Sequence, residues 1–162
     1  MAVLNPNEIF YTAFEPKQPF RFILYVEGIP AYMIKKVGGM KFEQSAVELH
    51  HINLIRYVKG KTKWNPIDLT LYDPISPSGV QAVMEWQRLH HESVTGRDGY
   101  SDFYKKDLTM NVLGPAGDIV SEIIIKGALI TSFNSGDYDW ENTGKAQEIS
   151  LTVQPDYCIV NY

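Results

Sequence analysis

The residue types that most often bind metals are few in this chain, and their spacing is unfavourable. The four histidines fall into two adjacent pairs, His50-His51 and His90-His91. Neighbouring residues of a strand point to opposite faces, and neighbouring residues of a helix diverge by about 100°. A metal ion needs ligands that converge on one point. The histidine pairs therefore predict no metal site.

Other residues with chemical potential each have a simpler explanation. Cys158 stands alone, and a lone cysteine is more often packed in a core or an interface than used as a nucleophile. The Gly38-Gly39 pair lacks the spaced glycines and the lysine of a phosphate-binding loop. Asp137 and Asp139 could share a strand face as glycosidase carboxylates do, but a solvated connection is the commoner setting. The sequence predicts no enzyme and no cofactor.

Charge is unevenly distributed along the chain. Residues 35–63 hold seven lysines and arginines against two glutamates, whereas residues 127–162 hold five acids against one lysine. The basic segment contains Tyr57 and is followed by Trp64, so this region could bind nucleic acid through phosphate contacts and stacking. The whole chain is acidic, with a net charge of −4, which favours an interface segment instead. The two regions could be unrelated solvated faces, or they could join successive copies head to tail in rings or filaments.

The elements that must position these residues are mostly strands. Apolar and polar residues alternate at 20–27, 67–72 and 148–154, and further apolar runs lie at 31–37, 108–112 and 119–130. We expect 20–27 and 31–37 to form a hairpin around Gly28. Within 40–66 the alternation slips at His50-His51, which indicates a β-bulge or the end of an element. Residues 58–63 are predicted to form an exposed basic loop.

One amphipathic helix is predicted at about 78–95. Ser78 suits the N-cap with Gln81 as its capping-box partner, and Gly96 suits the end of the helix. Val83 and Trp86 share the side that would pack on a sheet. Many short strands with a lone helix predict a mainly β fold, an antiparallel sandwich or barrel of two packed sheets flanked by the helix.

Length and composition suit a single domain over residues 1–162. We expect an N-terminal arm at 1–19 and an extended interface loop region at 38–66. No apolar run is long enough to span a bilayer, and the start of the chain does not look like a signal peptide, so no membrane partner is expected.

Several segments resemble the tail tube proteins of contractile-tailed bacteriophages, a family shared with the tubes of contractile injection systems. They are VMEWQ at 83–87, YKKD at 104–107, IIIKG at 123–127, DYDWEN at 137–142 and EISLTVQPDY at 148–157. The resemblance implies a virion tail protein, assembled in the host cytoplasm. Hexameric rings would stack into a hollow tube that conducts DNA, with a sheath outside and baseplate and tail-terminator proteins at its ends. A contact between successive rings would then join the basic and acidic regions through Lys59, Lys61, Lys63, Trp64, Asp137, Asp139 and Trp140.

Departures from the family pattern leave alternatives open. Pro155 cannot donate to a strand ladder, and the chain runs on through Cys158–Tyr162 beyond the usual signature. Either feature would suit an adaptor that starts or ends a tube. The tube of a type VI secretion system or of an extracellular contractile injection particle would share the fold. A small-ligand-binding β-barrel, or an enzyme on a sandwich scaffold, would need an apolar pocket with converging polar groups.

Overall fold

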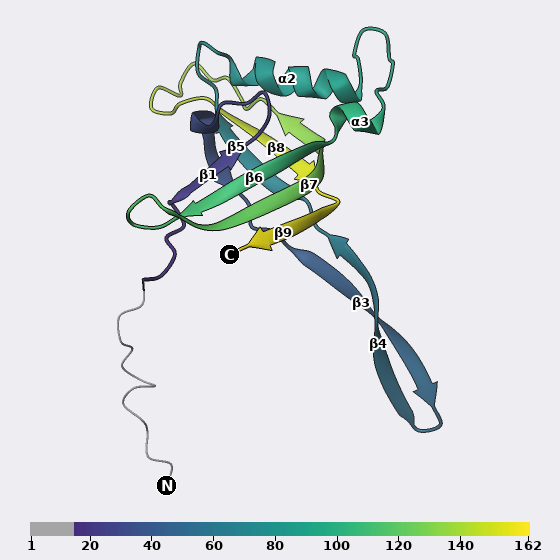
Figure 1. The fold of residues 1–162 in the computed structure, drawn as a ribbon. Coiled ribbons are helices and arrows are strands. Elements are labelled where there is room, and N and C mark those ends of the chain that lie inside the picture. The colour runs from purple at the N-terminus through teal and green to yellow at the C-terminus, as the bar shows by residue number, and fades with distance from the viewer. Residues whose placement is uncertain (1–14) are drawn as a thin grey trace.

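Strands dominate the computed structural model, which describes residues 15–162 (Figure 1). Residues 1–14 of the expected N-terminal arm lie outside this range. The strands are β1 (Phe22–Tyr25), β2 (Ile34–Val37), β3 (Phe42–His51), β4 (Leu54–Trp64), β5 (Ile67–Tyr72), β6 (Lys106–Leu113), β7 (Ile119–Asn134), β8 (Glu148–Gln154) and β9 (Tyr157–Asn161). The helices are α2 (Gly79–His90) and α3 (Ser101–Tyr104), and a single 3-10 turn covers Ala31–Met33.

Seven of these strands form the body of the molecule, in the order β1-β6-β7-β8-β5-β2 with β9 also on β7. The long strand β7 belongs to both halves of this sheet. Its first part pairs with β6 and β9, and its end pairs with β8, always antiparallel. The halves pack face to face, so the described residues form a β-sandwich with a flanking helix and no closed barrel. The fold class predicted from the sequence is confirmed.

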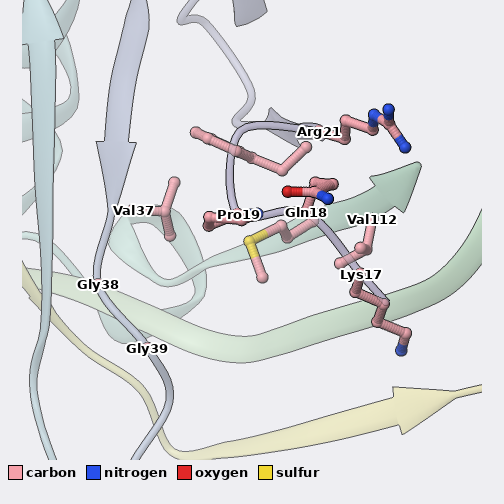
Figure 2. Close-up of a pocket in the computed structure, with 10 residues that line it drawn as sticks. Lys17, Gln18, Pro19, Arg21, Val37, Gly38, Gly39 and Val112 are labelled. Carbon is pink, nitrogen blue, oxygen red and sulfur yellow. The ribbon is translucent and has the colours of Figure 1, made fainter. Parts of the chain in front are cut away.

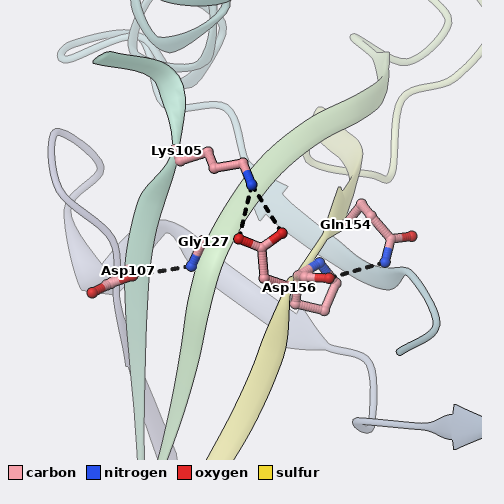
Figure 3. Close-up of polar contacts among 6 residues, drawn as sticks. Lys105, Asp107, Gly127, Gln154 and Asp156 are labelled. Carbon is pink, nitrogen blue, oxygen red and sulfur yellow. Dashed lines mark hydrogen bonds and ion pairs between the residues drawn. The ribbon is translucent and has the colours of Figure 1, made fainter. Parts of the chain in front are cut away.

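A polar network holds β7 where it passes from one half to the other (Figure 3). Gly127 has a φ of +63°, a backbone conformation that favours glycine, and a Cβ there would collide with the side chain of Asp156. The Gly127 amide donates to Asp107 Oδ1 at 3.0 Å. Lys105 Nζ lies 2.9 and 2.8 Å from the two carboxylate oxygens of Asp156. The bend is therefore fixed from both sides by acidic side chains.

The core lies between the two halves and under α2. Its fully buried large side chains are Leu24, Met33, Ile67, Leu69, Leu71, Val83, Trp86, Leu108, Ile125, Ile149, Leu151 and Val153. Six of them come from alternate positions of β5 and β8, as the alternation in the sequence predicts. Trp86 Nε1 donates to the Tyr104 carbonyl at 2.8 Å, which joins α2 to α3.

The helix α2 begins where the sequence predicts and ends earlier. Ser78 is the N-cap, and its hydroxyl accepts from the Gln81 amide. The expected end near residue 95 is wrong, because His91 is extended and bridges to Asp98. The Gly99 amide donates to the His90 carbonyl at 2.9 Å, so the returning chain occupies the helix end. The sequence could not show this return, which depends on a contact nine residues away.

The expected hairpin of 20–27 with 31–37 is also wrong. β1 pairs with β6 and β2 pairs with β5, at opposite ends of the strand order. The 3-10 turn between them carries Met33 into the core, and Leu24 of β1 is buried as well. The alternation predicted the strands correctly, but burial on either half of the sandwich satisfies it equally.

Candidate assembly surfaces

Strands β3 and β4 form an arm, Phe42–Trp64, that projects from the body (Figure 1). They pair only with each other, from Phe42 opposite Trp64 to His51 opposite Leu54. Ten or eleven residues at about 3.3 Å each give an arm of roughly 35 Å. The expected loop at 58–63 is therefore strand, and the slip at His50-His51 marks the end of β3.

The arm is exposed on both faces. Every residue of β3 is exposed, and so are most of β4. Its exposed large apolar side chains are Phe42, Val47, Leu49, Ile52, Leu54, Ile55, Tyr57 and Val58. Facing pairs show that Val47 and Val58 share one face, whereas Tyr57 lies on the other with Glu48. Isolated two-stranded hairpins are marginally stable in water, and exposed apolar patches of this kind mark protein interfaces.

The tip of the arm is conformationally unusual. Ile52 is fully exposed and has a φ of +46°. This region disfavours β-branched residues, since their side chains crowd the backbone there. Asn53 completes a two-residue turn for which asparagine and glycine are the usual choices. Ile52 is therefore strained in this turn and leaves its apolar side chain uncovered.

A bulge in β4 separates the three lysines expected to act together. Lys59 lies opposite Ala46 and Lys63 lies opposite Glu43, with the register shift between them. Ala46 and Glu43 are an odd number of residues apart in β3, so Lys59 and Lys63 point to opposite faces. Gly60 sits at the bulge, where a Cβ would lie 2.9 Å from the Ser45 carbonyl oxygen. The lysines share a strand and do not share a face.

Trp64 anchors the base of the arm. Its ring packs on Phe42 with centroids 5.3 Å apart, and it is half-buried. Gln154 Nε2 donates to the Trp64 carbonyl at 2.8 Å (Gln154 is drawn in Figure 3). The Asn65 amide donates to the Lys41 carbonyl at 2.9 Å. Gln154 could not be predicted as an anchor, because its position on the polar face of β8 gives no sign of a partner 90 residues away.

The acidic part of the expected interface lies in the connection between β7 and β8, residues 135–147. Asp137, Asp139 and Trp140 are exposed there, and Trp140 is fully so. Asp139 Oδ1 accepts from the Glu141 amide at 3.0 Å and supports the local turn. In Figure 1 this connection lies beside α2, at the end of the molecule opposite the arm. Within one chain the acidic connection and the basic arm do not meet.

His90 and His91 each make structural contacts, whereas His50 and His51 are exposed at the end of β3. His90 Nε2 accepts from the Ile130 amide at 3.1 Å, and its Nδ1 lies 3.1 Å from the Trp86 carbonyl. Its ring stacks on Tyr104. His91 pairs with Asp98 at 2.6 Å. Within residues 15–162, no three histidine, cysteine or acidic side chains are grouped as a metal site would require.

Cys158 lies on β9 opposite Ile125, half-buried beside the core. Burial raises the pKa of its thiol, which opposes formation of the reactive thiolate. This supports a packing role.

An apolar cleft of about 320 Å³ opens near the end of β2 (Figure 2). It is lined by Lys17, Gln18, Pro19, Arg21, Phe22, Val37, Gly38, Gly39, Met110 and Val112. Lys17 Nζ donates to Ser121 at 3.0 Å, and Arg21 lies 3.8 Å from Glu15. In Figure 2 both charged ends turn away from the apolar interior. The cleft therefore lacks the converging polar groups that a specific ligand site or an active site requires.

The fold is similar to that of several solved structures, although no sequence comparison finds a relative. No protein-family profile and no curated protein matches the sequence. Solved structures do match. The anti-feeding prophage tube-terminating cap aligns with a TM-score of 0.74 at 16% identity, over 99% of both chains. The sheath/tube terminator of the extracellular contractile injection system PVC aligns with a TM-score of 0.75 at 18% identity, over 93% of this chain and 100% of that one.

The PVC sheath-tube complex aligns with a TM-score of 0.71 at 19% identity, over 90% of this chain and 91% of that one. No helix among residues 15–162 has the length and apolar character needed to cross a membrane. The chain has the fold found in tube and tube-terminator assemblies of contractile injection systems, as its sequence resemblance predicts.

Proposed function

We propose that this protein is a structural subunit of the tube of a contractile-tailed phage or a related contractile injection system. The observation that carries the proposal is the arm, which exposes apolar side chains on both faces and pairs with no other strand of the body. Such an element gains stability when a second protein covers it. The likeness in fold to tube and tube-terminator proteins supports further copies of this chain as that cover.

Stacking of rings would use the two ends of the molecule. The arm carries Lys59, Lys61 and Lys63 at one end, and the connection 135–147 carries Asp137 and Asp139 at the other (Figure 1). Opposite charges at opposite ends suit a head-to-tail contact, which continues from ring to ring. Because the bulge divides the lysines between faces, we expect the arm to touch more than one neighbouring copy.

Closure of a ring would use the sheet edges. Among the described strands, β1, β2 and β9 each have one side without a strand partner. Pairing such edges between copies satisfies their amides and carbonyls and removes a route to aggregation. Six copies would form each ring, rings would stack into a hollow tube inside a sheath, and DNA would pass through the channel during ejection. The baseplate and a terminator would bind the tube ends, and the protein would reside in the virion tail.

A second candidate is a terminator or initiator that caps the tube. The alignments with terminator structures cover 99% and 93% of this chain, against 90% for the sheath-tube complex. The strand β9 adds a further edge beside β7, and an adaptor could use it for a different neighbour.

Electron microscopy of the purified protein tests both candidates. A tube subunit should form rings that stack into tubes of variable length, whereas a terminator should stop at single or paired rings. Particles that remain monomeric at high concentration, and also after addition of a purified baseplate, would contradict both.

A further inference from the structure

The sandwich is open along one side, and the apolar cleft of about 320 Å³ lies there. Among residues 15–162, β1 and β2 are the two ends of the strand order, so no ladder of hydrogen bonds joins the halves between them. The cleft is lined from both halves, by Phe22 and Met110 from one and by Val37 from the other. Val37 and Met110 also pack against the buried core. The cleft is therefore an opening into the core that an apolar group from outside can fill.

The wall of the cleft suits an apolar peptide. The charged ends of Lys17 and Arg21 turn away from the interior and form a cationic rim (Figure 2). Gln18 also lines the cleft, and its side-chain amide can donate to and accept from a peptide backbone. A Cβ added at Gly39 would have no atom of the described chain within 4 Å. The backbone at Gly39 therefore leaves room for the close approach of a second chain.

Residues 1–14, which precede the described part of the chain, have the composition of such a peptide. Their large apolar side chains are Val3, Leu4, Ile9, Phe10, Tyr11 and Phe14. Glu8 is the one charged side chain among them, and it stands next to Ile9. If Ile9 and Phe10 enter the cleft, the Glu8 carboxylate can approach the cationic rim. The segment therefore matches the cleft in both apolar character and charge.

The sequence of this segment favours a cleft on a neighbouring copy. Residues 8–14 include no Gly, Pro, Asn, Asp or Ser, the residue types that most often form tight turns. Glu15 lies 3.8 Å from the outward-turned end of Arg21, so the described chain begins outside its own cleft. Entry of Phe10 into that same cleft would need a sharp reversal within a few residues. A neighbouring cleft needs none, and seven residues can span up to about 23 Å.

We propose that the cleft binds residues 8–14 of a neighbouring copy, with Ile9 and Phe10 inserted between the two half sheets. The proposal rests on the proposed tube function, because an assembly brings a second copy close enough. It adds a link between copies that is separate from the arm and from the sheet edges. Each copy gives one segment and receives one, so the contact continues from copy to copy.

Photocrosslinking identifies the occupant of the cleft directly. Phe10 is replaced by p-benzoylphenylalanine, which keeps an aromatic ring and reacts under light with adjacent C–H bonds. This variant is co-assembled with a tenfold excess of unaltered protein labelled with nitrogen-15. The assemblies are examined by microscopy, irradiated and digested, and the crosslinked peptides are identified by mass spectrometry. A labelled acceptor peptide can arise only from a different copy.

The proposal expects most acceptor peptides to be labelled and to contain residues 37–39 or 110–112. Labelled acceptor peptides from the arm or from α2 would overturn the choice of the cleft. Unlabelled acceptor peptides from the cleft would overturn the choice of a neighbouring copy, and intact tubes without crosslinks would overturn both. A failure of the unaltered protein to form any assembly would instead contradict the proposed function.

A substitution in the same segment measures how much this contact contributes. Phe10→Asp should raise the protein concentration needed for tube formation at least tenfold, because a carboxylate cannot enter an apolar cleft without losing its hydration. The unfolding midpoint of the unassembled protein should stay the same. Asn5→Asp adds the same charge outside residues 8–14 and is the matched control. Tubes that form equally well from Phe10→Asp and Asn5→Asp would overturn the proposal.

Discussion

The sandwich and the arm are built from the same kind of alternating strand, but they differ in what covers their side chains. In β5 and β8 the apolar residues are buried between two half sheets and beneath α2. In β3 every residue is exposed, and among the strands of residues 15–162 it pairs with β4 alone. The sandwich covers its apolar residues within one chain, whereas we propose that a neighbouring copy covers those of the arm.

The largest loss of folding stability is expected from a substitution in the core of the sandwich. Trp86→Ala removes a fully buried ring and its hydrogen bond to the Tyr104 carbonyl. We expect the free energy of unfolding to fall by about 3–5 kcal/mol, measured by denaturant titration. Tyr57→Ala in the arm is the matched aromatic control and should change it by less than about 0.5 kcal/mol. Equal losses would mean that the arm is as well packed as the body.

Apolar residues of the arm should affect assembly alone. Leu49→Ser and Tyr57→Ser alter opposite faces of the arm. We expect each to leave the unfolding midpoint unchanged and to abolish or sharply reduce tube formation, measured by sedimentation and microscopy. Gln44→Ser, an exposed polar change in the same strand, is the control. If only one of the two serine variants loses tubes, the arm has a single docking face.

Charge reversal should have a moderate effect. Replacing Lys59, Lys61 and Lys63 by Glu should weaken stacking and leave a folded monomer, because the acidic connection would then face like charge. Adding Asp137→Lys and Asp139→Lys should restore assembly in part. Stacking of the unaltered protein should weaken as salt rises. Unchanged tubes in the triple variant would exclude this charge contact.

A substitution at the tip of the arm should have two smaller effects of opposite sign, a more stable turn and weaker assembly. Asn tolerates a positive φ better than a β-branched residue does, so Ile52→Asn should relax the turn by about 1 kcal/mol. The same change removes a fully exposed apolar side chain. We expect lower amide exchange at the tip of the monomer together with weaker assembly. Stronger assembly would show that Ile52 contributes no contact.

The smallest effect concerns acid sensitivity of the body. Hydrogen bonds from Lys126 and from the Gly127 amide hold the pKa of Asp107 below its usual range. A lowered pKa in the folded state stabilises the fold above the unfolded pKa, and this contribution is lost as the pH falls through the folded pKa. Asp107→Asn should flatten the stability profile in that acidic range and leave its slope near neutral pH unchanged. An identical acid profile for the variant would exclude this role.

Sequence patterns predicted the body well because local alternation and burial agree there. The strand 148–154, the long strand through Gly127 and the Ser78 cap all follow from nearby residues. Pairing partners were less predictable. The alternation of 20–27 and 31–37 is equally satisfied by a hairpin and by two edge strands on different halves.

The arm was the hardest element to predict, since both of its faces mix apolar and polar residues. Its signals were Phe42 and Trp64 placed symmetrically about Ile52-Asn53, and a glycine opposite Ser45. These signals are interpretable only once the pairing is known. The expected interface residues Asp137, Asp139 and Trp140 are exposed, and their contact with the lysines remains a proposal about two copies.

Hydrogen–deuterium exchange of the amides in residues 42–64 tests the central claim most directly. The arm should exchange rapidly in the unassembled protein, while β5 and β8 are protected, and assembly should slow exchange in the arm by at least tenfold. If the arm is already protected in the monomer, or if its exchange is unchanged in rings and tubes, it is not the element that joins the copies.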